Sequence, residues 1–261
     1  MRLGEIIQCL EQYAPPYLQD DYDNSGLQIG LVDAEITGVL ICLDVTEAII
    51  DEAAARSCNL IVSHHPLLFH PLKQISGRTY QQRCVAKALG SGISIYSAHT
   101  SLDNAPGGVN YEIARRIGLK DINWLSPKQG LDAGSGIVGH LRKPEEDKAF
   151  LARLKSEFEV RSLLHSQTDG RMIKKVAVCG GAGAFLLPDA IRNGADCFIC
   201  GEFHYHDYFE NEGVLLAELG HYQSEQFTKD LFNNILSKNF QNLRIEMTSI
   251  DTNPIRYDID D

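Results

Sequence analysis

An apolar strand, a helix and a second apolar strand follow one another in a way that limits the folds open to this chain. Val39–Leu43 forms the first apolar run, Thr46–Arg56 has helical character, and Cys58–Ser63 forms the next apolar run. Alternation of this kind predicts a right-handed crossover connecting two parallel strands. A further apolar run, Ile93–Tyr96, extends the same pattern. We therefore expect an α/β fold built on a largely parallel sheet.

The same order recurs in the second half of the chain. Val176–Cys179 is followed by a helical stretch, Leu186–Asn193, and then by the apolar run Cys197–Cys200. Val39 and Asn59 are as far apart in the sequence as Val176 and Asp196, and both second strands end in polar residues. A general likeness between any two strand–helix–strand units would also explain the spacing. The matching polar ends favour an internal duplication, which predicts two similar α/β domains.

The expected boundary between the two domains lies in a stretch rich in Gly, Ser, Asp and Pro, Lys120–Gly136. We predict a first domain over residues 1–125 and a second over residues 126–219. The C-terminal segment 220–261, with a strand at Leu243–Met247, is expected to pack back on the first domain.

Composition excludes several classes of protein. The formal net charge of −11 argues against a nucleic-acid partner, because phosphate binding needs a basic face. The apolar runs are the length of strands and shorter than the ~20 residues that a membrane span needs. The seven cysteines are scattered and odd in number, which favours a reducing compartment over a disulfide framework. We therefore expect a cytoplasmic protein without membrane association.

Two adjacent histidines, His64 and His65, follow directly on the apolar run Leu60–Ser63. Neighbouring side chains on extended backbone point in different directions, so two such imidazoles can serve two different centres. Two imidazoles at the end of a buried strand are costly unless something binds them. Metal ions are the obvious ligands.

Other polar residues also follow predicted strands, where ligands bind in open α/β sheets. His99 and Asp103 follow Ile93–Tyr96, and His221 and Glu225 follow the apolar run Val214–Leu219. A histidine and a carboxylate four residues apart on a helix share one face and can bind one metal ion. For Asp103, the alternative is a residue that caps a turn. For His221 and Glu225, the alternative is an ion pair on the helix surface that binds no metal.

Three imidazoles and two carboxylates form the predicted ligand set: His64, His65, Asp103, His221 and Glu225. Such donors suit borderline divalent metals, namely Zn, Fe, Mn, Co or Ni, better than Ca or Mg. Five protein ligands for two divalent ions leave positions open to water, which is typical of catalytic sites.

Several residues are weaker candidates for catalysis or substrate binding. The catalytic candidates are His99, His206 and Glu202. His204 is a further candidate for lining the substrate cleft. For these histidines, an ordinary buried or loop position is the alternative. The glycine-rich run Gly180–Gly183 follows a strand and precedes a helix, so its amides are a possible phosphate cradle. Cys197 and Cys200 are predicted to be thiols of the core.

Five motifs in order resemble the GTP cyclohydrolase 1 type 2 family, also called the NGG-interacting factor three-like family. They are Asp23–Gly30, Ser63–Pro66, His99–Asp103, Gly201–Asp207 and Gly220–Glu225. The resemblance covers nearly the whole chain. It implies two similar α/β domains with a dinuclear metal site in the cleft between them, and a toroidal homohexamer. It also implies that Asp103 and Glu225 bridge the two metal ions.

The resemblance implies a metal-dependent hydrolase that acts on a small, nucleotide-like substrate. In the reaction of the family name, water attacks the imidazole ring of GTP, the ring opens and formate is released, leading to dihydroneopterin triphosphate. A metal-dependent phosphoesterase is one alternative. A non-catalytic, metal-binding hexameric scaffold or regulatory protein is another.

Overall fold

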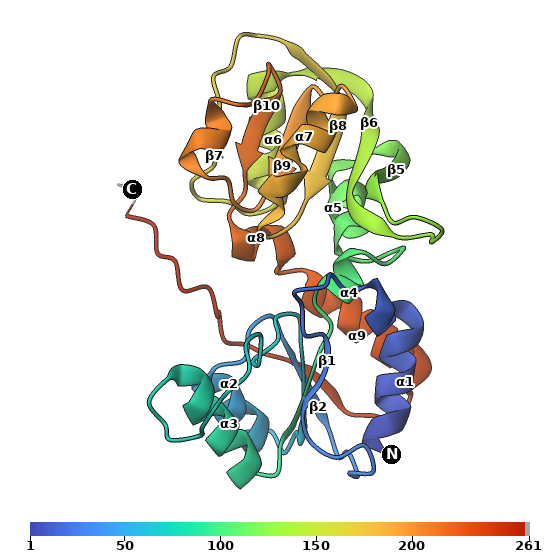
Figure 1. Ribbon diagram of the computed structural model, residues 1–261, viewed down its shortest axis with the longest axis vertical. Coiled ribbons are helices and arrows are strands. Elements are labelled where there is room, and N and C mark those ends of the chain that lie inside the picture. Colours follow the sequence, from blue (N-terminus) through green and yellow to red (C-terminus); the bar gives the residue numbers. More distant parts are fainter. Residues whose placement is uncertain (259–261) are drawn as a thin grey trace. The chain divides into compact units, whose positions relative to one another are not determined.

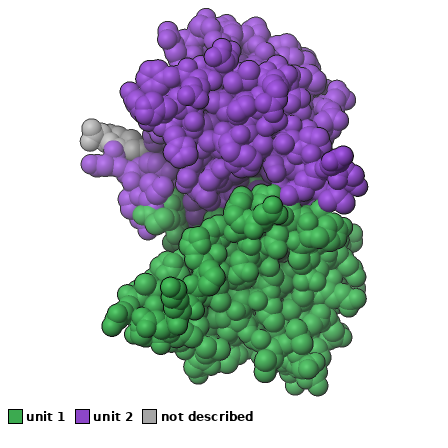
Figure 2. Space-filling model, viewed as in Figure 1, with its two compact units in different colours: residues 1–102, 227–254 green, residues 103–226, 255–261 purple. Residues whose placement is uncertain are grey.

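The computed structural model describes residues 1–258 and divides the chain into two compact units. Unit 1 comprises Met1–Leu102 and Phe227–Pro254, and unit 2 comprises Asp103–Gln226 and the C-terminal residues from Ile255 on (Figure 2). Each unit contains its own sheet, so the architecture is α/β.

Unit 1 is built on a sheet with the strand order β1-β4-β3-β2-β11. The strands are β1 (Gly26–Ile29), β2 (Val39–Cys42), β3 (Leu60–Ser63), β4 (Ser94–Ser97) and β11 (Ile245–Met247). Neighbouring strands from β4 to β11 run parallel, and β1 joins the edge antiparallel to β4. The three central strands are buried along their whole length, as expected of parallel strands covered on both faces.

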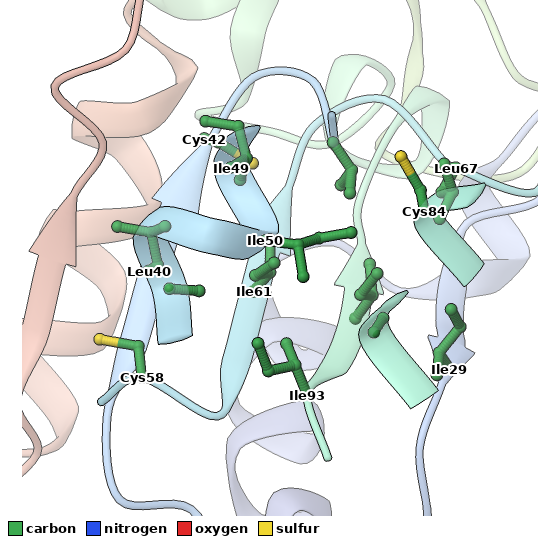
Figure 3. Packing of buried hydrophobic residues seen from close by; sticks show 14 of the residues in the cluster. Ile29, Leu40, Cys42, Ile49, Ile50, Cys58, Ile61, Leu67, Cys84 and Ile93 are labelled. Carbon is green, nitrogen blue, oxygen red and sulfur yellow. The ribbon is translucent and has the colours of Figure 1, made fainter. Parts of the chain in front are cut away.

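Helices cover both faces of this sheet (Figure 1). They are α1 (Leu3–Tyr13), the short η1 (Pro16–Leu18), α2 (Glu47–Ala55), α3 (Tyr80–Gly90) and α9 (Thr228–Asn239). α2 packs against α3, whereas α1 packs against α9 on the other side of the sheet. Under α2 and α3, Ile50 and Ile61 lie in an apolar cluster with Ile93 and Cys84 (Figure 3). This core holds the strand ends of unit 1 in fixed positions.

Unit 2 is built on a mixed sheet with the strand order β5-β6-β8-β9-β10-β7. The strands are β5 (Lys120–Pro127), β6 (Gly134–Glu146), β7 (Leu164–His165), β8 (Met172–Cys179), β9 (Cys197–Cys200) and β10 (Leu215–Glu218). β8, β9 and β10 run parallel, and β5, β6 and β7 are antiparallel to their neighbours.

Short helices complete unit 2. They are α4 (Thr100–Asp103), which begins in unit 1, α5 (Val109–Ile117), α6 (Asp147–Glu157), η2 (Gly183–Leu186), α7 (Leu187–Arg192), η3 (Tyr205–Tyr208) and α8 (His221–Glu225). α5 and α6 pack against each other and against β6 and β8. Leu187 of α7 lies in a core cluster with Val138 and Phe198 of the sheet. No helix among residues 1–258 is both long and apolar enough to span a bilayer.

The repeated spacing in the sequence has a direct structural counterpart. Val39 of β2 pairs with Leu60 of β3, and Val176 of β8 pairs with Cys197 of β9. In both units a helix connects these parallel strands. The common origin of the two units remains our inference from the spacing.

The division of the chain differs from the boundary that the glycine-rich stretch suggested. Lys120–Gly136 is no linker, because β5 and the start of β6 pair there as an antiparallel hairpin of unit 2. Residues 103–125 also belong to unit 2, since α5 packs on its sheet. Of the C-terminal segment, residues 227–254 belong to unit 1, where α9 and β11 pack on β2.

Candidate metal centre

Three histidines gather beyond the carboxyl ends of β3 and β4 in unit 1. His64 and His65 follow β3 directly, and His99 lies two residues after β4. The ring centroids of His64 and His65 are 4.9 Å apart, and that of His99 lies 5.3 and 5.4 Å from them. One ring nitrogen of each histidine lies within 4.8 Å of the others. These imidazoles are close enough to hold a cation.

Each of these rings is oriented through its Nδ1 atom. His64 Nδ1 lies 3.0 Å from the carbonyl oxygen of Ala98, and His65 Nδ1 lies 2.7 Å from an oxygen of Asp44. His99 Nδ1 lies 2.7 Å from Asp23. Since the partner atoms are acceptors, Nδ1 carries the proton and Nε2 presents its lone pair. Metal-binding histidines in proteins are oriented in this way.

The acid that orients His99 is itself tightly held. The buried side chain of Asp23 accepts hydrogen bonds from Ser25 Oγ at 2.9 Å and from Thr100 Oγ1 at 2.6 Å. The amides of Asn24 and Thr100 also donate to it, at 2.7 and 3.0 Å. Burial acts to raise the pKa of Asp23, but the bonds from His99, Thr100 and Asn24 outweigh it and lower the pKa. Asp23 is therefore a carboxylate at neutral pH.

The acid that orients His65 is held in a similar way. Thr252 Oγ1 donates to Asp44 at 2.7 Å. Burial acts to raise the pKa of Asp44, but the hydrogen bonds from His65 and Thr252 lower the pKa below the ordinary value. The C-terminal segment of unit 1 thus fixes a carboxylate behind a histidine.

Unit 2 contributes a second cluster on the helix α8. Gly220, with φ of +91°, turns the chain from β10 into α8. His221 Nε2 lies 3.2 Å from Glu225 Oε2, which is the expected contact of residues one turn apart. His221 Nδ1 lies 2.9 Å from Glu202 Oε1. Glu202 orients His221 in unit 2 as Asp44 orients His65 in unit 1.

The two carboxylates strongly favour the protonated form of His221. Burial acts to lower the pKa of His221, but the hydrogen bonds and charges of Glu202 and Glu225 raise it to about 11. The hydrogen bond from His221 in turn lowers the pKa of Glu202. A divalent cation would replace this proton and leave both carboxylates ionised.

The first two amides of the glycine-rich run after β8 do not serve as a phosphate cradle. The amide of Gly180 donates to Asn110 Oδ1 at 3.0 Å, and that of Gly181 donates to Ser224 Oγ at 3.0 Å. These amides are therefore already engaged. Gly181 has φ of +60°, and a Cβ there would lie 2.3 Å from Glu225 Oε1. Gly181 is glycine because the Glu225 carboxylate packs against its backbone.

Asp103 is the last residue of α4 and is half-buried in unit 2. Its carbonyl oxygen accepts a hydrogen bond from Asn110 Nδ2 at 3.1 Å. The next residue, Asn104, is buried and accepts a bond from Ser135 Oγ at 3.0 Å. The backbone that carries Asp103 is thus anchored to α5 and β6. Its place in a shared ligand set with the histidines of unit 1 remains a prediction.

The two loop histidines lie on the exposed η3 segment. The His204 side chain is 90% exposed and lies 3.5 Å from Asp207. The ring of His206 lies 5.4 Å from that of Tyr205 and 6.3 Å from that of Phe209. A role of His204 or His206 in binding substrate remains a prediction. The cysteines predicted to be core thiols, Cys197 and Cys200, are free and buried.

The donors in both units fit a divalent transition metal. Imidazole Nε2 atoms and ionised carboxylates are the ligands that Zn and its neighbours prefer. His64 is fully buried. Burial of an imidazole costs free energy unless its ring nitrogens form hydrogen bonds or bind a metal ion.

A family model described as Duf34/NIF3 (NGG1p interacting factor 3) matches residues 1–254. The chain belongs to this family. The GTP cyclohydrolase 1 type 2 homolog of Clostridium perfringens is 35% identical over 229 residues, which cover 86% of this chain and 87% of that protein. The protein of the same name from Lactococcus lactis is 31% identical over 264 residues, covering 99% of this chain and 100% of its own. The crystal structure of Staphylococcus aureus hypothetical protein SA1388 has a TM-score of 0.91 at 27% identity, over 98% of this chain and 99% of that one.

The sequence pointed to Glu202, but it did not point to Asp23 and Asp44, the carboxylates that orient His99 and His65 in this NIF3-family chain. Asp44 follows the apolar run of β2 at the same edge of the sheet as His65, and that position was the available signal. Asp23 lies in the first of the five motifs, but its hydrogen bond to His99 joins residues 76 positions apart. Only the folded chain brings these pairs together.

Proposed function

We propose that this NIF3-family protein is a metal-dependent hydrolase with a dinuclear centre. The ligands would be the five residues predicted from the sequence: His64, His65, Asp103, His221 and Glu225. The observation that carries the proposal is the shared orientation of the histidines in both units. His65 and His221 each direct Nδ1 at a carboxylate, so each ring presents Nε2 on its opposite side, and that of His221 lies 3.2 Å from Glu225, a further predicted ligand.

A pair of divalent ions held by these residues would lower the pKa of water and polarise the bond under attack. The protein residues around them have separate tasks. Asp44 and Glu202 hold His65 and His221 in the tautomer that binds metal. His99, fixed by Asp23, is our first candidate for handling a proton, since its ring lies beside both histidines of unit 1.

The proposed substrate is a nucleotide, and the proposed reaction is the opening of the purine ring of GTP. The names of relatives that share 30% identity or more over most of the chain support this choice. The family resemblance also leads us to propose a homohexamer. Sedimentation equilibrium tests that assembly directly, because a hexamer would have six times the mass of the chain.

GTP turnover by the metal-reconstituted protein tests the proposed function. Formate release and pterin fluorescence are followed for the wild type, for Asp103→Ala and for the control Asp33→Ala, which removes an exposed carboxylate from a loop. We expect metal-dependent turnover in the wild type and in Asp33→Ala, and its loss in Asp103→Ala. Absence of turnover in a wild type that binds two metal ions would remove GTP as the substrate. Retention of both ions by Asp103→Ala would remove that residue from the ligand set.

A further inference from the structure

A hollow of about 470 Å³ opens in the sheet of unit 2, among residues that the metal centre does not use. It is lined by Lys120, Asp121, His140, Leu141, Arg142 and Lys174. These residues come from the start of β5, the middle of β6 and the start of β8. The volume falls in the range of ~300–1,000 Å³ that is usual for small-molecule sites.

Two irregularities of the sheet meet at this hollow. The pairing of β5 with β6 shifts register between Lys120 and Asn123, and Asp121 lies there with φ of +51°. The pairing of β6 with β8 shifts between His140 and Glu145. Bulges redirect side chains, and a non-glycine residue in the left-handed region is uncommon and strained. Strain of this kind gathers at functional sites.

A lysine stabilises the second bulge from inside the hollow. Lys174 Nζ donates to the carbonyl oxygens of Leu141 at 2.6 Å and Arg142 at 3.3 Å, which lie in the stretch where the β6–β8 register shifts. An ammonium group has three donors, so one donor of Lys174 is left for a ligand. The hollow therefore has a positive charge held in a fixed position.

The hollow concentrates positive charge in a chain whose formal net charge is −11. Lys120, Arg142 and Lys174 outnumber its one carboxylate, Asp121. Within residues 1–258, the side chains of Lys120 and Arg142 make no hydrogen bond or ion pair. Other arginines of this chain, such as Arg83 and Arg153, pair with a glutamate instead.

We propose that this hollow binds a phosphorylated small molecule that carries hydroxyl groups, such as a sugar phosphate. Arg142 offers the planar fork that fits phosphate oxygens, and Lys120 and Lys174 add point charges. Asp121 would repel a bare phosphate, but its carboxylate can accept a hydrogen bond from a hydroxyl group of the ligand. The combination of three cations with one acceptor thus favours an ester over inorganic phosphate.

The site is separate from the residues of unit 2 that we assign to the metal centre. β8 carries Lys174 near its start and runs into Gly180 and Gly181 beyond its end. At ~3.3 Å per residue, about 20 Å of strand separates Lys174 from Gly180. Binding here can therefore be measured whether or not the proposed hydrolase activity exists.

Calorimetric titration of the full-length protein with ribose 5-phosphate and with inorganic phosphate tests the proposal. It is run on the protein as isolated and after metal removal, so that phosphate bound by metal ions is identified. Arg142→Gln is compared with Lys143→Gln, which removes the same charge from the next residue, outside the hollow. We expect Arg142→Gln to weaken the binding of ribose 5-phosphate at least tenfold. Lys143→Gln should change the affinity less than threefold.

A further variant separates the two contacts that the proposal assigns. Asp121→Asn should tighten the binding of inorganic phosphate, because a negative charge is lost. The affinity for ribose 5-phosphate should increase less or decrease, because the acceptor for its hydroxyl group is lost as well. Equal gains for both ligands would overturn the role of Asp121. Equal effects of Arg142→Gln and Lys143→Gln, or no saturable binding by the metal-free wild type, would overturn the site. Thermal unfolding of each variant shows that the fold is kept.

Discussion

Gly181 shows at the scale of one residue how the backbone makes room for the candidate metal centre. A Cβ at this position would lie 2.3 Å from Glu225 Oε1, and φ is +60°. We expect Gly181→Ala to lower the free energy of unfolding by about 1–3 kcal/mol, and to weaken metal binding by displacing Glu225. Thermal unfolding and metal analysis of the purified variant measure both effects.

Gly194→Ala is the matched control for this prediction. Gly194 has nearly the same φ, +64°, but a Cβ there would meet nothing within 4 Å. Gly194→Ala should therefore lower the free energy of unfolding through backbone strain alone, while metal binding stays unchanged. Equal metal content in the two variants would contradict the role that we give to Gly181.

Asp44 is expected to act on metal affinity through His65. Its oxygen lies 2.7 Å from His65 Nδ1 and fixes the ring. Loss of a carboxylate that orients a metal-binding histidine typically costs about 10–100-fold in affinity, and we expect this loss in Asp44→Ala. Competition with a chromophoric chelator measures it. Asp51→Ala removes a largely exposed carboxylate that pairs with Lys87, and it should leave the affinity unchanged.

Metal binding should release protons from His221 at neutral pH. With its pKa raised to about 11 from 6.5, His221 is protonated at pH 7 in the metal-free protein. Its contribution to folding stability is complete below pH 6.5 and is lost as the pH rises towards 11. Because only the neutral ring binds metal, affinity should increase with pH over this range.

Titration calorimetry in buffers of different ionisation enthalpy counts the released protons. Glu202→Gln removes one of the two carboxylates that raise the pKa of His221, so proton release should cease at a lower pH in this variant than in the wild type. The same pH dependence of the proton count in wild type and variant would show that His221 is not the source.

At the scale of one element, the crossover helix α2 depends on its cap. Thr46 accepts a hydrogen bond from the amide of Ile49 at 3.3 Å, while Ile49 and Ile50 bury the inner face of the helix. Thr46→Ala should lower the free energy of unfolding by about 1 kcal/mol, since the amide of Ile49 is left without its acceptor. Urea unfolding measures the change. Thr46→Ser keeps the acceptor, and a loss as large as that of alanine would contradict the cap.

The parallel strands of both units are the elements that the sequence predicted best. β2, β3 and β4 are buried along their whole length, so their apolar runs are visible without any structure. The hairpin of β5 and β6 escaped prediction. Its glycines resemble a linker, but Gly134 and Gly139 lie where a Cβ would come within 3 Å of the facing strand. Glycine that the close approach of two strands requires was interpreted as a domain boundary.

At the scale of the whole molecule, the state of the cysteines can be tested on the intact protein. All seven cysteines lie among the described residues, and they are free and buried. Burial raises the pKa of Cys84 to about 11 and that of Cys200 to about 12. Because the thiolate is the reactive form, no thiol should react rapidly with Ellman's reagent in the native protein. Seven should react after unfolding in denaturant without reductant, and a smaller number would indicate a disulfide.

The sequence by itself determined the α/β class, the strand ends that carry polar residues, and the family. These features are local, because burial leaves an apolar run and a ligand motif occupies a few consecutive residues. Tertiary structure alone decided the pairs His99–Asp23, His65–Asp44 and His221–Glu202, and the division of the chain into units. Each pair joins residues 19 or more positions apart, so its hydrogen bond exists only after the strands have found their register.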